Sequence, residues 1–135
     1  MDIVTATKRF PKEEFNMGII VQKYGGTSVA DLERIQHVAK RVTHTYDQGN
    51  NVVVILSAMA GVTDKLINLA NEVTEKPDRR ELDVLLATGE QTTAALLAMM
   101  LRSMDYPAAS LMGYQADVVT DCEFGNARII EIGGE

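Results

Sequence analysis

The chain has 135 residues, of which 46% are hydrophobic, and this is enough for one domain with a buried core. Its net charge of -6 offers no basic face to neutralise a phosphate backbone, so nucleic acid is excluded as an expected partner. Its single cysteine, Cys122, has no disulfide partner, and its most apolar run is far shorter than the roughly 20 residues of a membrane span, so we expect a cytoplasmic protein without a membrane segment.

The first residues differ in character from the rest of the chain. Residues 1–16 mix charged and apolar side chains and lack the continuous apolar stretch of a secretory signal, so they are predicted to be an N-terminal extension. The domain itself is predicted to span residues 17–135. Its first element is a strand over residues 18–23, which the glycines of Tyr24-Gly25-Gly26-Thr27 then break.

A helix is predicted after this break, with Ser28 placed to cap its free amides. Residues 48–51 supply a turn, and residues 52–56 are a continuous β-branched run, typical of a parallel strand covered on both faces. Strand, crossover helix and strand form a βαβ unit, so the predicted class is α/β, with a mainly parallel sheet sandwiched by helices. The apolar positions that define the helix are Val29, Leu32, Ile35, Val38, Ala39, Val42 and Tyr46.

Helices dominate the middle of the chain. A second helix is predicted to begin at Thr63-Asp64, where a hydroxyl and a carboxylate suit a helix N-terminus, and to end before Lys76-Pro77. Two further helical stretches are predicted over residues 81–86 and 91–104, interrupted by the glycine of Thr88-Gly89-Glu90. The second helix is expected to bury Leu66, Ile67, Ala70 and Val73.

The chain after Pro107 is predicted to contain only short strands. They lie over residues 109–112, 118–119 and 129–132, and no internal repeat is present.

The most informative segment for function is Lys23 to Ser28. Glycines without side chains let backbone amides approach an anion, and Lys23 at the strand end adds positive charge, which favours a phosphate cradle. The lysine precedes the glycines, so the segment is neither a Walker A sequence nor a GxGxxG motif. An ordinary strand-to-helix turn explains this segment equally well when it is taken alone.

A second loop, residues 57–64, carries small residues and hydroxyls at the carboxyl end of the next predicted strand. Two such loops on adjacent parallel strands are expected to converge, which favours a site, although Ser57 and Thr63 are also suited to satisfying loop amides. Glu90 either binds the ammonium group of an amino-acid substrate or is an ordinary surface carboxylate, and taken singly the surface role is favoured.

Taken together, these segments resemble the aspartate kinases, in the order in which that family carries its signatures. The resemblance covers residues from about Met17 to Ile132. Other amino-acid kinases, acting on glutamate, acetylglutamate or uridylate, share a lysine-glycine first loop and are the alternative. The matching segments are Lys23-Tyr24-Gly25-Gly26-Thr27-Ser28, Leu56-Ser57-Ala58-Met59, Thr63-Asp64 and Ala87-Thr88-Gly89-Glu90-Gln91.

The resemblance implies an amino-acid-kinase fold and transfer of the ATP γ-phosphoryl group to the β-carboxylate of L-aspartate, the entry to lysine, threonine and methionine synthesis. It makes Lys23 the catalytic cation and gives Glu90 the α-ammonium of aspartate. No residue is expected to bind a metal directly, because Mg²⁺ would be carried by the nucleotide. The implied phosphate-binding residues are Lys23, Tyr24, Gly25, Gly26 and Ser57, and the implied aspartate-binding residues are Ser57, Thr63, Asp64 and Glu90.

The resemblance also implies that this domain is incomplete, since the family continues with a nucleotide-holding half. We therefore expect a truncated kinase domain that is inactive alone and that self-associates or forms a homo-oligomer through exposed apolar surface. A non-catalytic module that binds phosphate or aspartate, or that pairs with a full-length kinase, is the alternative.

Overall fold

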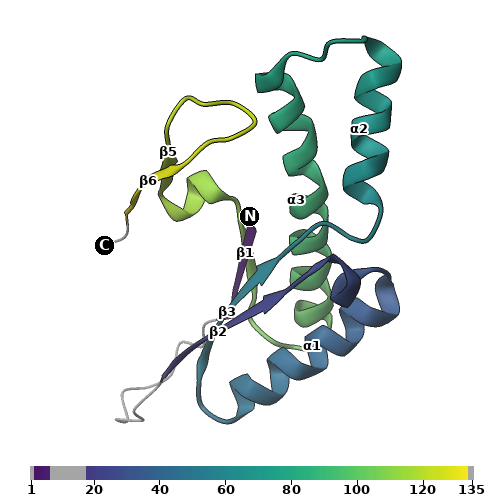
Figure 1. The fold of residues 1–135 in the computed structure, drawn as a ribbon. Coiled ribbons are helices and arrows are strands. Elements are labelled where there is room, and N and C mark those ends of the chain that lie inside the picture. Colours follow the sequence, from purple (N-terminus) through teal and green to yellow (C-terminus); the bar gives the residue numbers. More distant parts are fainter. Residues whose placement is uncertain (1, 7–17, 134–135) are drawn as a thin grey trace.

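A computed structural model describes residues 2–6 and 18–133 of the chain (Figure 1). Within these residues the strands form a four-stranded sheet, in the order β2-β3-β1-β4, and a separate two-stranded sheet, β5-β6. The elements in chain order are β1 (Asp2–Ala6), β2 (Ile19–Tyr24), the 3-10 helix η1 (Gly26–Val29), α1 (Leu32–Asp47), β3 (Asn51–Leu56), α2 (Val62–Val73), α3 (Arg79–Ser103), β4 (Ala109–Leu111), the 3-10 helix η2 (Gly113–Ala116), β5 (Val118–Thr120) and β6 (Ile129–Ile132).

The predicted βαβ unit is present and confirms the α/β class. β2 and β3 pair in parallel, with Ile19 opposite Asn51 and Tyr24 opposite Leu56, and α1 connects them. β1 is antiparallel to both β3 and β4, so β2, β3 and β4 all run in one direction. The sequence reasoning missed β1, because it treated residues 1–16 as an extension outside the domain.

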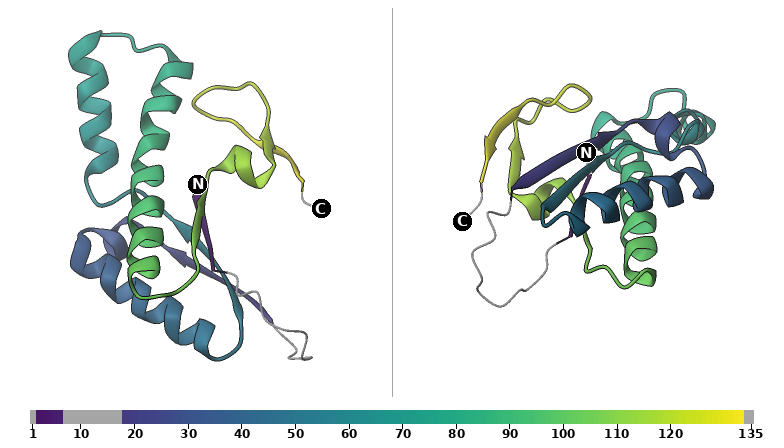
Figure 2. Two further views of the ribbon diagram at one scale, coloured as in Figure 1. Left: turned by 180° about the vertical axis from the view of Figure 1, so that it is seen from behind. Right: turned by 90° about the horizontal axis from the view of Figure 1, so that it is seen from below.

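The core lies between this sheet and two helices. α1 and α3 lie on the same side of the sheet (Figure 2) and pack against alternate residues of β3. The opposite face of β3, with Val53 and Ile55, is only half-buried, so its covering is less complete than the continuous apolar run indicates. The largest fully buried side chains are Val29, Ile35, Val42, Val52, Val54, Leu56, Thr93, Leu97 and Leu101.

The predicted apolar stripe of α1 is largely confirmed, but the helix begins differently. Its cap is Asp31, whose Oδ1 accepts a hydrogen bond of 2.8 Å from the backbone N–H of Arg34. Ser28 lies inside η1, so the prediction that it caps the helix is wrong. Leu32, the first helical residue, is 59% exposed because it precedes the turn at which α1 meets the core.

Asp31→Ala is expected to destabilise the fold by about 1 kcal/mol, because it removes an acceptor for an N–H at the start of α1. Ser28→Ala, the matched control, is expected to stay within about 0.5 kcal/mol, since Ser28 is exposed and does not cap the helix. Urea unfolding followed by circular dichroism measures both. Equal effects of the two substitutions would contradict the assignment of Asp31 as the cap.

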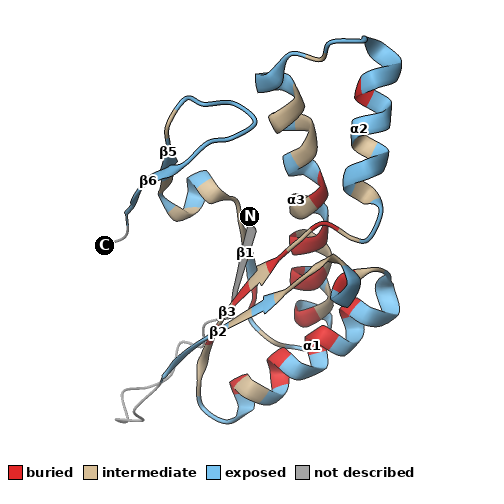
Figure 3. Ribbon diagram, viewed as in Figure 1, coloured by how far each residue is buried: buried red, intermediate tan, exposed pale blue. Residues whose placement is uncertain are grey.

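α2 contacts α3 but is poorly covered elsewhere (Figure 3). The prediction that it buries four apolar residues is wrong for three of them. Only Ala70 is buried, whereas Leu66 is half-buried, Ile67 lies at the surface and Val73 is 86% exposed. The apolar face of α2 is wider than the surface that α3 offers it within the described residues.

α3 is a single helix of 25 residues, so the predicted interruption at Gly89 is wrong. A glycine inside a helix costs about 1 kcal/mol relative to alanine, which the packing of a long helix offsets. By length and composition α3 is also long and apolar enough to cross a membrane, with a mean hydropathy of 1.4 over its most apolar window. Its face with Thr93, Leu97 and Leu101 is buried in the core, as in the central helix of a globular domain.

The strands predicted after Pro107 are all present. β4 joins the four-stranded sheet through β1, whereas β5 and β6 form an antiparallel hairpin that lies away from α1 (Figure 1). The hairpin loop is tied to α3 by the backbone N–H of Gly125, which donates a hydrogen bond of 2.7 Å to Asp83 Oδ2. The side chains of β6 are exposed, so the hairpin adds little to the core.

Candidate functional site

The first glycine loop begins where β2 ends. Gly25 is extended, with φ -78° and ψ 168°, and its carbonyl accepts a hydrogen bond of 2.9 Å from the N–H of Ser28 as η1 closes. Lys23 is exposed, and its Nζ lies 3.9 Å from the position that a Cβ on Gly25 would take. The ammonium group therefore lies beside the glycine backbone, the position that a phosphate cradle would need.

The second loop, residues 57–61, touches the first. The N–H of Ser57 donates a hydrogen bond of 3.2 Å to the carbonyl of Tyr24. A Cβ on Gly26 would lie 2.9 Å from the carbonyl oxygen of Ala58, closer than real Cβ atoms approach such an atom. The two loops therefore meet backbone to backbone, which only a glycine at position 26 allows.

A segment of α3 also packs against the second loop. Gly89 is buried, and a Cβ on it would lie 3.0 Å from Ala58 Cβ and 3.3 Å from Val62 Cγ1. Gly89 thus serves helix packing, not helix interruption. Its neighbour Glu90 is half-buried and directly follows Gly89 in α3.

Gly89→Ala is expected to destabilise the fold by about 1 kcal/mol, because overpacking against Ala58 exceeds the gain in helix propensity. The double variant Gly89→Ala with Ala58→Gly removes the opposing methyl group and is expected to recover part of this loss. A double-mutant cycle from urea unfolding measures the coupling between the two positions. A cycle without coupling would contradict the direct contact between α3 and the loop.

The start of α2 carries the remaining two candidate residues. The helix begins at Val62, after Gly61 with φ 76°, so Thr63 and Asp64 lie in its first turn and not at its cap. Both are exposed. The positive end of the helix dipole favours an anionic group at this position, and Val62 in the same turn packs against Gly89.

Tyr24 contributes its backbone, not its hydroxyl, to the loop. Its side chain packs against the core cluster, and its hydroxyl donates a hydrogen bond of 2.8 Å to Gln22 Oε1. Burial raises the pKa of Tyr24, and the nearby charge of Arg41 partly opposes this shift. The phenol therefore stays neutral at physiological pH, while the Tyr24 carbonyl accepts the hydrogen bond from the N–H of Ser57.

One basic feature was missed in the sequence. A hollow of about 500 Å³ lies between β2 and α1, and Lys40, Arg41 and His44 line it together with Lys23. Arg41 lies one position after Lys40, and His44 lies four positions after Lys40. All three are exposed and lie outside the apolar stripe of α1. The hollow adds positive potential beside Lys23. A second hollow, of about 600 Å³ beside the β5–β6 loop, contains none of the candidate residues.

No group of three or more His, Cys, Asp or Glu side chains suited to holding a metal ion exists in residues 2–6 and 18–133. A divalent cation at the glycine loops would thus need most of its ligands from a bound phosphate, as Mg²⁺ commonly does.

Comparison with known proteins decides the family. The sequence model of the amino acid kinase family matches residues 18–132, which is nearly all of the chain after its first residues. The chain belongs to the amino acid kinase family. All the candidate residues, from Lys23 to Glu90, lie inside the matched stretch.

The relatives of this amino acid kinase chain are aspartokinases. It is 56% identical over 116 residues to the aspartokinase of Geobacillus stearothermophilus, covering 86% of this chain and 28% of the relative. It is 49% identical to aspartokinase 2 of Bacillus subtilis, with the same coverage. The solved structure of aspartate kinase from Synechocystis matches with a TM-score of 0.62 and 52% identity over 64% of this chain and 15% of that chain. The resemblance to the aspartate kinases is confirmed, and the chain spans less than a third of these relatives' length.

Proposed function

We propose that this chain carries the phosphate-binding and aspartate-binding loops of an aspartate kinase. The supporting observation is the backbone contact of the two loops, in which Gly26 meets Ala58, with Gly89 packed against the same residue. The expected cation, Lys23, lies beside the first loop, and the expected ammonium acceptor, Glu90, directly follows Gly89 in α3. The identity of 49–56% to aspartokinases favours aspartate over the other amino-acid substrates of the family.

The proposed reaction is phosphoryl transfer from ATP to L-aspartate. A β-carboxylate oxygen of aspartate forms a bond to the γ-phosphorus, and the bond from that phosphorus to the β,γ-bridging oxygen breaks, so that 4-phospho-L-aspartate and ADP result. Negative charge spreads over the transferred group in the transition state. Lys23 and the amides of Gly25 and Gly26 would stabilise this charge, with the Ser57 hydroxyl beside them.

We assign the aspartate side of the proposed site to the remaining candidate residues. The half-buried Glu90 would accept the α-ammonium group, and Thr63 and Asp64 at the positive end of α2 would contact the substrate beside the second loop. Mg²⁺ would arrive on the nucleotide phosphates and neutralise their charge during transfer.

We further propose that turnover requires protein beyond these 135 residues, because the chain spans only 28–29% of its relatives. Losing part of the site removes orientation and electrostatic stabilisation, and each ~1.4 kcal/mol of lost stabilisation slows the reaction tenfold. The exposed apolar residues of β2, Ile19 and Val21, and of α2 favour self-association of the isolated chain. A cytoplasmic location and a role in lysine, threonine and methionine synthesis complete the proposal.

Calorimetric titration of the chain with Mg-ATP and L-aspartate tests the binding roles. Lys23→Ala is expected to weaken Mg-ATP binding roughly 10- to 100-fold, because a charged contact to a phosphate contributes about 1.5–3 kcal/mol. Lys40→Ala is the matched control, since it removes a lysine from the same hollow without touching the glycine loop, and we expect a change of less than about threefold.

The outcomes of this titration separate the candidate functions. Equal weakening by Lys23→Ala and Lys40→Ala would contradict a specific role for Lys23. Binding of glutamate in preference to aspartate would assign the site to another branch of the family. Absence of any binding would mean that these loops need the rest of the domain to form a site.

A further inference from the structure

The hollow between β2 and α1 gathers positive charge that the glycine loops do not account for. Lys23, Lys40 and Arg41 line it, and no Asp or Glu is among its lining residues. The chain as a whole is acidic, with 19 Asp and Glu residues against 13 Lys and Arg residues. The charge at this hollow is therefore opposite in sign to the net charge of the protein, and it attracts anions.

The three cations are not neutralised by the part of the chain that the structure describes. No ion pair in that part involves any of them. Lys40 and Arg41 also have no Asp or Glu three or four positions away on α1, where a helical ion pair would form. Like charges that line one hollow repel one another, so a bound anion would relieve this repulsion.

The half-buried residues that line the hollow are polar and hydrogen-bonded to one another. Gln22 Nε2 donates a hydrogen bond of 2.8 Å to Thr45 Oγ1, and the Tyr24 hydroxyl donates one of 2.8 Å to Gln22 Oε1. The side-chain nitrogen of Gln22 carries a second N–H, for which the described residues provide no acceptor. Two hydrogen bonds thus orient the Gln22 amide, and one of its donors stays available to an anion.

The size and chemistry of the hollow fit a small ligand that carries phosphate. Its volume of about 500 Å³ lies within the range of small-molecule pockets, roughly 300–1,000 Å³. Arg41 offers a planar guanidinium fork suited to two oxygens of one phosphate group, and Lys40 adds a point charge. A phosphate group brings up to about two negative charges and three acceptor oxygens, which match several cations better than the single charge of a carboxylate does.

We propose that the hollow between β2 and α1 is a binding site for a small phosphate-bearing ligand, in which Lys40 and Arg41 bind the phosphate and the Gln22 amide donates to it. Free phosphate, pyrophosphate and phosphorylated metabolites all carry this chemistry. The proposal does not depend on the proposed kinase reaction, because none of these three residues is assigned a role in that reaction.

Nuclear magnetic resonance of the whole ¹⁵N-labelled chain tests the site, because it separates the hollow from the glycine loops. The side-chain amide of Gln22 reports on the hollow, and the backbone amides of Gly25 and Gly26 report on the first loop. Sodium pyrophosphate is titrated without Mg²⁺, so that the phosphate charge is not neutralised. We expect the Gln22 side-chain signal to shift and to saturate.

Substitutions in the hollow test its specificity. Arg41→Ala is expected to weaken pyrophosphate binding at least about tenfold, and Arg41→Lys, which keeps the charge but loses the fork, about threefold. Arg79→Ala is the matched control, because Arg79 is also an exposed arginine but lies in α3, outside the hollow. We expect it to change the affinity less than about twofold. Both positions are exposed, so the variants are expected to fold.

Three further titrations identify the ligand. Tighter binding of glycerol 3-phosphate than of inorganic phosphate would support a phosphorylated metabolite, and the reverse order would support the free anion. Citrate that binds as tightly as pyrophosphate would overturn the assignment to phosphate.

Other outcomes would overturn the hollow as a site. Equal weakening by Arg41→Ala and Arg79→Ala would mean that only general charge attracts the anion. Shifts confined to Gly25 and Gly26 would place pyrophosphate at the glycine loop alone. A chain that binds pyrophosphate in the hollow but fails to bind Mg-ATP at the loops would instead support this proposal and contradict the proposed function.

Discussion

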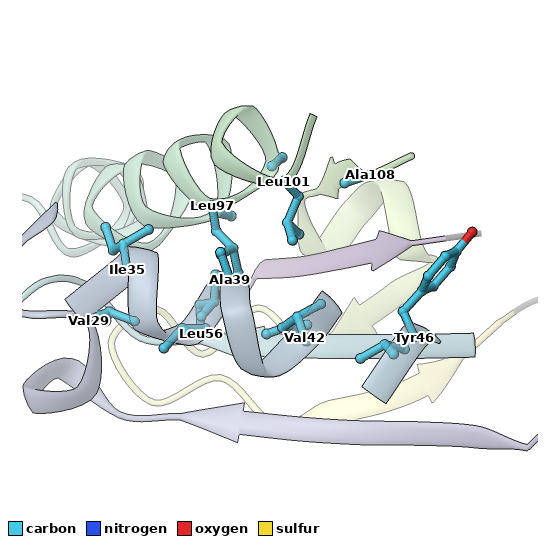
Figure 4. Packing of buried hydrophobic residues seen from close by; sticks show 14 residues of the cluster. Val29, Ile35, Ala39, Val42, Tyr46, Leu56, Leu97, Leu101 and Ala108 are labelled. Atoms are coloured by element: carbon cyan, nitrogen blue, oxygen red, sulfur yellow. The ribbon is translucent and has the colours of Figure 1, made fainter. Parts of the chain in front are cut away.

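Leu97→Ala is expected to destabilise the chain by about 2–5 kcal/mol, the largest effect of any single substitution proposed for it. Leu97 is 1% exposed and extends from α3 toward Ala39 of α1 and Leu56 of β3 (Figure 4). Three elements thus meet at one side chain. Removing the Leu97 side chain leaves a cavity, and no one of the three elements can fill it without disturbing its packing against the others. The loss of buried apolar surface and the cavity therefore both lower the free energy of unfolding.

The measurement is the free energy of unfolding from urea titration, followed by far-ultraviolet circular dichroism. Met99→Ala is the matched control, because Met99 lies on the same helix two residues away and is 59% exposed. We expect the control to change stability by less than about 1 kcal/mol. A small effect of Leu97→Ala would mean that α3 does not form the core with α1 and β3.

Gly26→Ala is expected to combine a loss of stability with a loss of ligand binding. Its new Cβ would lie 2.9 Å from the carbonyl oxygen of Ala58, a backbone atom that cannot rotate away. One of the two loops must then shift, at a cost of about 1–3 kcal/mol. Because the shift separates the glycine loop from the second loop, we expect Mg-ATP binding to weaken as it does in Lys23→Ala.

Gly113→Ala is the matched control for this substitution. Both glycines begin a 3-10 helix, but a Cβ on Gly113 meets no atom within 4 Å. We expect its stability to stay within about 0.5 kcal/mol of the parent and its ligand binding to remain unchanged. Urea unfolding and calorimetry on both variants make the comparison. A Gly26→Ala protein as stable as Gly113→Ala would contradict the backbone contact between the loops.

The two predictions address different parts of the molecule and have different consequences. Leu97 lies in the core beneath the sheet, whereas Gly26 lies where the loops at the carboxyl ends of β2 and β3 meet. A core substitution is therefore expected to lower stability without changing affinity in the molecules that remain folded. The loop substitution is expected to change both, since the loops are the candidate site.

Several features could be predicted because they depend on local pattern. The stripe of α1, including Ile35, Val38 and Val42, follows from the period of a helix, and the run from Val52 to Leu56 follows from the preference of β-branched residues for strands. The glycines at 25 and 26 mark the first loop for the same kind of reason. The spacing of these features along the chain also carried the resemblance to the aspartate kinases.

Other features could not be predicted, because they depend on which surfaces meet. Gly89 has the helix-breaking tendency that predicts an interruption, yet it lies within a continuous α3, where its missing side chain admits Ala58. Asp31 and Ser28 are both good capping residues, and only the path of η1 decides between them. The apolar spacing of α2 predicts a buried face, but burial also needs another element to cover that face. Val73 is 86% exposed because little of the described structure covers it.

By itself, the sequence determined the order of the strands, helices and glycine loops after residue 18, and through their motifs the family, because periodicity and glycine placement are properties of neighbouring residues. The tertiary structure decided that Gly26, Ala58 and Gly89 meet at one point, and that residues 2–6 form a strand in the centre of the sheet. The reason is that both depend on contacts between residues far apart in the chain. Such contacts depend on how closely two backbones can approach and on which strand edge has unpaired backbone groups. Neither property can be predicted from the pattern of neighbouring residues.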